Sequence, residues 1–210
     1  MKKISFFVIS FFFVLNGLAH DFVVNNIYYN ITSNKSPRTV SVTYMGTSSS
    51  SAQYSGSVTI PSEVYYEGNY YTVTEITSSA FYNCKQLTSI TLPVTIQSAA
   101  SNAFTNCTGL KTVTINCLTA PSCFNGLKSI ATVDLGGVKK IVKNAFAKCT
   151  GLKNLFSGYS LEDIGESAFS GCTGLTAVDF PSSLTQIGAS AFADCSNLEA
   201  LTIPSSVTTT

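Results

Sequence analysis

Apolar residues recur along this chain with a period close to 23 residues. The stretch Ala168–Pro181 (AFSGCTGLTAVDFP) returns as AFADCSNLEALTIP at Ala191–Pro204. With the Phe as origin, Cys lies three residues on, Leu six, a β-branched residue or Leu nine, another apolar residue eleven and Pro twelve. This template aligns with six phenylalanines at intervals of 23, 20, 22, 23 and 23 residues: Phe81, Phe104, Phe124, Phe146, Phe169 and Phe192. The period predicts a solenoid of six stacked coils, numbered here by these residues.

The pattern within a coil predicts its elements. Leu87–Pro93 (LTSITLP) alternates apolar and polar residues as a strand does, and Pro ends the strand because it lacks a backbone donor. Leu184–Cys195 (LTQIGASAFADC) predicts a second extended segment, followed after Gly188 by a short helical turn. Coil three, which has Asn116 and Thr119 at apolar positions, is the weakest member and is expected to bulge first.

The cysteines follow the same period. The third residue after each Phe is Cys84, Cys107, Leu127, Cys149, Cys172 and Cys195 in turn. Since Leu127 can replace Cys, the position favours a compact apolar group inside the solenoid. Cys117 and Cys123 lie outside this series and are the candidates for a disulfide, should the exported chain form one.

The N-terminal part lacks the repeat. Residues 1–19 begin with two lysines, continue with an apolar run and end in small residues, as a signal peptide does. Residues 20–72 are rich in tyrosine and predict a β-rich cap, with a hairpin around Glu67-Gly68-Asn69. A tyrosine-rich binding face is the alternative for this segment.

Composition and charge narrow the possible functions. Only 11% of the 210 residues are charged and the formal net charge is +1, so electrostatics do not favour nucleic acid or an anionic membrane surface as partner. Stacking would place three lysines of coil four beside three carboxylates of coil five, in the pairs Lys139–Glu162, Lys140–Asp163 and Lys143–Glu166.

Candidate chemistry is scarce. The one histidine, His20, adjoins the signal peptide, so a Ser-His or Cys-His dyad has no base within the repeats. No metal-ligand spacing or phosphate-binding glycine loop occurs. We expect no catalytic residues, no metal site, no cofactor and no enzymatic activity.

The phrases SLTQIGASAFADC and SAFADCSNLEALTIPSSV resemble the BspA-type leucine-rich repeats of bacterial surface proteins. The resemblance covers about Val58 to Val207. It implies a curved, right-handed leucine-rich-repeat solenoid, with a parallel β-sheet, on a secreted or surface-attached protein. It also implies adhesion to host proteins or other cells and no catalytic residues.

The outward strand positions, eight and ten residues after each Phe, form the expected ligand-binding face. They are small and hydroxyl-rich, and the candidate ligand-binding residues among them are Thr91, Thr114, Asp134, Phe156, Asp179 and Thr202. Whether Phe156 points outward, or inward in place of Ser157, stays open.

Two functions remain. The first is an exported, non-catalytic binding or adhesion module for an extracellular protein or glycan, and the second is a structural spacer or surface-layer component without a specific ligand. Residues 73–210 comprise the six coils and an incomplete seventh, so the chain either continues or self-associates at this open edge. No membrane span is expected after signal cleavage.

Overall fold

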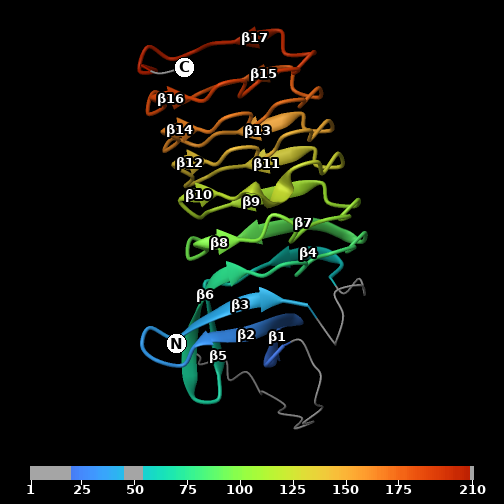
Figure 1. Ribbon diagram of the computed structural model, residues 1–210, viewed down its shortest axis with the longest axis vertical. Helices are drawn as coiled ribbons and strands as arrows, with labels where there is room; N and C mark the ends of the chain where they lie inside the picture. Colours follow the sequence, from blue (N-terminus) through green and yellow to red (C-terminus); the bar gives the residue numbers. More distant parts are fainter. Residues whose placement is uncertain (1–19, 45–53, 209–210) are drawn as a thin grey trace, which may run out of the picture.

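The computed structural model describes residues 20–44 and 54–208. The proposed signal peptide, the serine-rich stretch at residues 47–51 and Thr210 lie outside these residues. Successive coils stack along the long axis of the molecule, above an N-terminal group of longer strands (Figure 1). The predicted solenoid is confirmed.

One strand of each coil contributes to a long parallel surface. Five strands pair in the order β13-β11-β9-β7-β4. Their bounds are β4 Gly56–Thr59, β7 Leu87–Leu92, β9 Thr112–Ile115, β11 Thr132–Asp134 and β13 Asn154–Phe156. In coils five and six, β15 (Ala177–Val178) and β17 (Ala200–Leu201) pair with each other in the same parallel sense. The outward side of these strands is called the strand face below.

The other extended segment of each coil forms a second parallel sheet of very short strands. These are β10 (Thr119–Ala120), β12 (Lys140–Ile141), β14 (Asp163–Ile164) and β16 (Gln186–Ile187). The pairing aligns the buried residue of each strand with that of the next: Ala120 lies beside Ile141, Ile141 beside Ile164 and Ile164 beside Ile187. Each of these coils therefore contributes an apolar side chain to the interior at the same level.

The N-terminal strands form a mixed sheet. Their order is β1-β2-β3-β6-β5, with bounds β1 Phe22–Val24, β2 Ile27–Ser33, β3 Thr39–Thr43, β5 Glu63–Tyr66 and β6 Asn69–Ile76. The predicted hairpin is present, with Tyr66 paired to Asn69 across a turn in which Glu67 and Gly68 have positive φ.

The N-terminal sheet and the solenoid share residues. Strand β4 lies inside the range 20–72, yet it pairs with β7 on the strand face. Strand β6 extends from the hairpin into coil one and pairs with β8 (Ser98–Ala99) of coil two. The two parts therefore interlock over residues 56–76, and no single boundary at residue 72 separates them.

The segment between the two strands is built from consecutive turns instead of the expected helical turn. A residue with positive φ interrupts it twice in most coils, as at Ser167 (53°) and Gly171 (73°) in coil five. Left-handed residues cannot continue a right-handed helix. The one regular helix among the described residues is a 3-10 turn, η1 (Ser122–Phe124), in coil three.

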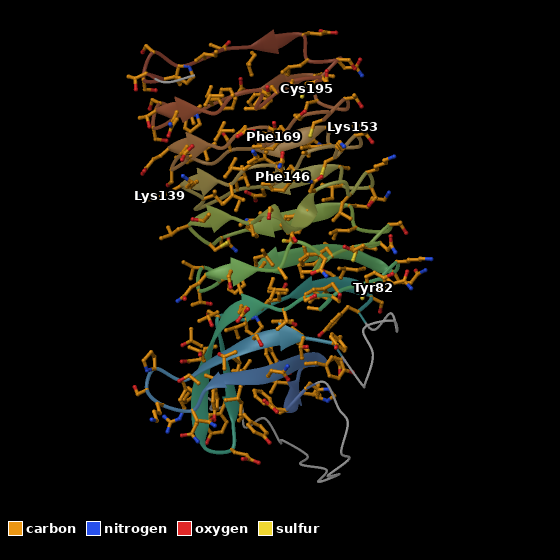
Figure 2. The ribbon with its side chains drawn as sticks, viewed as in Figure 1. Tyr82, Lys139, Phe146, Lys153, Phe169 and Cys195 are labelled. Atoms are coloured by element: carbon orange, nitrogen blue, oxygen red, sulfur yellow. The ribbon has the colours of Figure 1, made fainter. Side chains whose placement is uncertain are left out.

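The six repeat phenylalanines form one aromatic stack through the interior. Neighbouring ring centroids lie 4.6–5.7 Å apart from Phe81 to Phe192. Tyr54, just before β4, extends the stack with its ring 4.5 Å from that of Phe81. Side chains in the middle of the stack, such as Phe146 and Phe169, are fully buried. Figure 2 shows both rings pointing into the solenoid.

The repeat cysteines (Cys84, Cys107, Cys149, Cys172 and Cys195) form a row beside this stack. Four thiols donate to the carbonyl oxygen of the Phe one coil earlier, at 2.9 Å for Cys107 to Phe81 and 3.1–3.2 Å for the others: Cys149 to Phe124, Cys172 to Phe146 and Cys195 to Phe169. Cys84 bonds instead within its own coil, to the carbonyl of Tyr82. The prediction that these residues pack the interior is confirmed.

The suggested Cys117–Cys123 disulfide is not formed, because all seven cysteines are free. In coil three, Asn116 and Thr119 are exposed, while Cys117 and Ala120 are buried. A shift of one residue therefore supplies the interior with apolar groups, and Cys117 serves as one of them. Its thiol donates to the carbonyl of Thr119 at 3.3 Å.

Candidate binding face

The strand face carries a row of aligned side chains. Strand pairing places Thr91 beside Thr114, Thr114 beside Asp134 and Asp134 beside Phe156. Asp179 and Thr202 take the equivalent places in coils five and six, directly after β15 and β17. The six predicted site residues thus follow one line along the solenoid. The line changes from threonines to carboxylates and an aromatic ring at coil three.

Phe156 points outward, which answers the question left open by the sequence. Its side chain is 59% exposed, whereas Ser157 is buried. Ser157 stands where other coils have an apolar residue, and its hydroxyl donates to the carbonyl oxygen of Asp179 at 2.8 Å. That bond satisfies the buried hydroxyl and keeps the strand in register.

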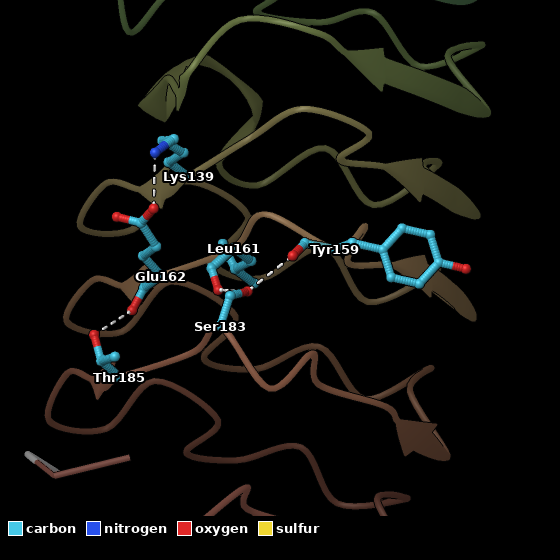
Figure 3. A network of polar contacts seen from close by, with 6 residues as sticks. All are labelled: Lys139, Tyr159, Leu161, Glu162, Ser183 and Thr185. Carbon is cyan, nitrogen blue, oxygen red and sulfur yellow. Dashed lines mark hydrogen bonds and ion pairs between the residues drawn. The ribbon is translucent and has the colours of Figure 1, made fainter. Parts of the chain in front are cut away.

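Tyr159, which no sequence pattern marked as a site residue, is the most exposed large hydrophobic residue nearby, at 95%. The preceding Gly158 has φ of 65°, and a Cβ there would lie 2.4 Å from the carbonyl oxygen of Gly136. Only glycine therefore permits this turn. Ser183 fixes the following backbone by donating to the carbonyls of Tyr159 (3.0 Å) and Leu161 (2.8 Å). Figure 3 shows the phenol ring extending away from this anchored backbone.

These residues surround an open depression of about 650 Å³. Asp134, Phe156, Tyr159 and Asp179 line it, together with Lys153 and several small polar residues. Asp134 accepts a hydrogen bond from the backbone N–H of Gly136 at 3.0 Å. Thr91, Thr114 and Thr202 are not among its lining residues. The depression therefore offers two carboxylates and two aromatic rings to a partner.

The charged groups of coils four and five pair as predicted. Lys139, Lys140 and Lys143 contact Glu162, Asp163 and Glu166 at 2.8, 2.6 and 2.7 Å. Lys139 lies on the opposite side of the solenoid from Lys153 (Figure 2), and its bond to Glu162 is drawn in Figure 3. All three pairs join residues 23 positions apart, so they fix the register between the two coils.

Four of the buried thiols resist ionisation. Burial raises the pKa of Cys107 to about 12 and that of Cys149 to about 12, and it raises those of Cys123 and Cys172 further. A thiol that keeps its proton is a poor nucleophile and a poor metal ligand.

Among residues 20–44 and 54–208, no group of three His, Cys, Asp or Glu side chains is placed to hold a metal ion. The same part of the chain has no helix of the length and hydropathy that crossing a membrane requires.

Known structures share this architecture. A leucine-rich repeat protein from Bacteroides ovatus is 28% identical over 90% of this chain, with a TM-score of 0.54. The T. pallidum leucine-rich repeat protein is 25% identical over 85%, with a TM-score of 0.51. A leucine-rich cell surface protein from Faecalibacterium prausnitzii, at 24% identity over 90% and a TM-score of 0.54, shares the fold.

This chain spans 54%, 69% and 54% of the lengths of those three proteins. A comparison with curated proteins gives no match. A family model described as "BspA type Leucine rich repeat region (6 copies)" matches residues 60–138 and 118–210, which together include all six phenylalanines of the stack. The periodic interior, the two parallel sheets and this match agree: the chain belongs to the BspA-type leucine-rich repeat family.

Proposed function

We propose that this protein is an exported, cell-surface, non-catalytic binding module that attaches to an extracellular protein or glycan through the strand face. The observation that carries the proposal is the joint exposure of Phe156 and Tyr159 beside one depression. Large aromatic side chains are costly to leave in water, and they are enriched at the centres of binding interfaces.

The groups that surround Phe156 favour ligand binding over a purely structural role. Asp134 and Asp179 flank Phe156 along the row, and neither carboxylate forms an ion pair within the described residues. The backbone beneath the site is held by the Ser157 and Ser183 hydroxyls, so little order must be gained on binding. A preformed aromatic and acidic surface supports a ligand-binding role over that of a passive spacer.

The test uses the full chain against two sets of probes. Immobilised collagen, laminin and fibronectin represent extracellular proteins, and an array of glycans represents carbohydrates. For any probe that binds, Phe156→Ala and Tyr159→Ala should each weaken binding about tenfold, the effect of losing roughly 1.4 kcal/mol.

Tyr70→Ala is the matched control, since Tyr70 is also an exposed aromatic (64%) but lies on the N-terminal hairpin. Unchanged binding of this variant supports the strand face as the site. Loss of binding in Tyr70→Ala, with Phe156→Ala unaffected, would move the site to the N-terminal tyrosines. Failure of the intact protein to bind any probe would favour the spacer function.

A further inference from the structure

The near-neutral net charge conceals a strong separation of charge on the solenoid. Between residues 77 and 161 the chain has eight lysines and a single acidic residue, Asp134. Three of these lysines are paired with carboxylates of coil five. The other five are exposed and form no ion pair with any described residue: Lys85, Lys111, Lys128, Lys148 and Lys153.

The repeat brings these five lysines to one side. Each lies two to seven residues after the Phe of its coil, where the turn segment leads into the strand face. We call this side the turn edge. Figure 2 shows Lys153 there, across the solenoid from Lys139. Coils stack about 4.8 Å apart, so positive charge continues over roughly 15 Å from coil one to coil four.

Neutral hydrogen-bonding groups lie between the lysines. Lys128 borders a second depression together with Asn106, Thr108 and Ser129. Asn106 and Thr108 are exposed, and their side chains form no hydrogen bond with the described residues. Ammonium groups alternating with amides and hydroxyls can bind anionic groups and sugar hydroxyls at the same time.

We propose that the turn edge binds an acidic polysaccharide, a chain of sugars carrying sulfate or carboxylate groups. The composition of the edge favours this partner over nucleic acid. Proteins that bind single strands use successive aromatic side chains for base stacking, and Tyr82 is the one aromatic residue at this edge outside the stack. The edge has no arginine, the residue best suited to bidentate contacts with phosphates and bases.

The surface is separate from the strand-face depression, except that Lys153 borders both. Lys153 is therefore left intact in the test. The turn-edge variant is Lys111→Gln/Lys128→Gln/Lys148→Gln. The matched control is Lys139→Gln/Lys140→Gln/Lys143→Gln, which removes the same number of exposed positive charges from the opposite side.

Binding is measured with a fluorescent heparin oligosaccharide, by anisotropy, from about 50 to 200 mM NaCl, the range over which ionic binding to polyanions weakens strongly. We expect the turn-edge variant to bind about tenfold or more weakly than the intact protein. The slope of log affinity against log salt should fall by about three, one for each lost contact. The control variant should bind within about twofold of the intact protein, and Phe156→Ala should bind fully.

Several results would overturn the proposal. One is the absence of heparin binding at the lowest salt concentration, and another is equal loss in the two triple variants. Equal or tighter binding of a DNA duplex would show that the partner class is wrong, and equal binding of neutral dextran would remove the ionic basis. If the turn-edge triple variant loses its folded circular dichroism, the three single variants replace it, each expected to lower the slope by about one.

Discussion

The Cys172 thiol donates a hydrogen bond to the carbonyl oxygen of Phe146, one coil earlier, at 3.1 Å. The ring of Phe146 stacks on that of Phe169, three residues before Cys172, with centroids 5.4 Å apart. The same pair of contacts joins coils five and six through Cys195 and Phe192. Aromatic packing and a thiol donor thus act together at successive coil junctions.

Replacing Cys172 tests the thiol donor. Cys172→Ala removes a buried sulfur and its hydrogen bond, so we expect the free energy of unfolding to fall by about 1–3 kcal/mol. Cys172→Ser retains a donor of similar reach and should cost less. Urea unfolding followed by circular dichroism measures both variants. A larger loss for Ser than for Ala would mean that the position requires only an apolar group.

The buried thiols also predict how stability depends on pH. In the folded protein burial keeps Cys107 protonated up to a pKa of about 12, whereas an unperturbed thiol ionises near 9.0. Between these values the unfolded chain binds fewer protons, so the free energy of unfolding falls as pH rises. Urea midpoints measured from pH 8 to 11 should decline from about pH 9, and less steeply in Cys107→Ser.

Alkylation gives an independent measurement of the same property. Iodoacetamide at pH 8 should modify Cys195, which is half-buried, before the six buried cysteines. Mass spectrometry of the peptides reports the order. Rapid modification of Cys107 or Cys149 in the folded protein would contradict the burial described above.

Two phenylalanines ten residues apart should behave in opposite ways. Phe146→Ala opens a cavity in the middle of the aromatic stack, so we expect a loss of about 3–5 kcal/mol of stability. Phe156→Ala removes an exposed ring and should change stability by less than about 0.5 kcal/mol. Thermal unfolding compares the two variants directly. Similar losses in both would place Phe156 inside the solenoid.

The ion pair Lys140–Asp163 should be the strongest of the three, because the Asp163 side chain is only 22% exposed. A double-mutant cycle with Lys140→Gln and Asp163→Asn should give a coupling of up to about 1 kcal/mol at low salt. The same cycle at Lys139–Glu162, where both side chains are about half exposed (52% and 51%), should give less. High salt should reduce both couplings. A coupling that is unaffected by salt would contradict an ionic origin.

Most of the fold could be predicted from the repeat period of about 23 residues. The inward positions of Phe, Cys, Leu and Ile and the three Lys–carboxylate pairs depend only on residues in the same phase of neighbouring coils. The pairs and most of these inward positions are found in the structure. The exceptions are Leu201 and Ile203 of coil six, which are exposed. The predicted helical turn was wrong. Residues with positive φ, such as Asn83, Asn144 and Asp194, interrupt this segment, and the spacing of apolar residues does not reveal which residues adopt positive φ. The sequence left a Cys117–Cys123 disulfide open; both cysteines are free, and a one-residue shift places Cys117 in the interior.

The candidate site was only partly predictable. Strand alternation predicted the outward position of Asp134 but left the direction of Phe156 open. The exposure of Tyr159 depends on a turn that Gly158 makes against Gly136 in the preceding coil. Tyr54 extends the aromatic stack from outside the repeat, so no template contains it. The net charge of the whole chain, +1, does not reveal the five unpaired lysines. Their arrangement emerges only when residues are grouped by their side of the solenoid.

The direction of the hydrogen bonds between coils has a mechanical consequence. Bonds such as Lys153 N–H to Ala131 O and Ser167 N–H to Ala189 O link successive coils along the long axis of the molecule. Tension applied along that axis loads every junction equally, and because each coil contacts only its neighbours, the weakest junction opens first. A molecule pulled at its two ends would therefore lengthen coil by coil instead of opening in a single step.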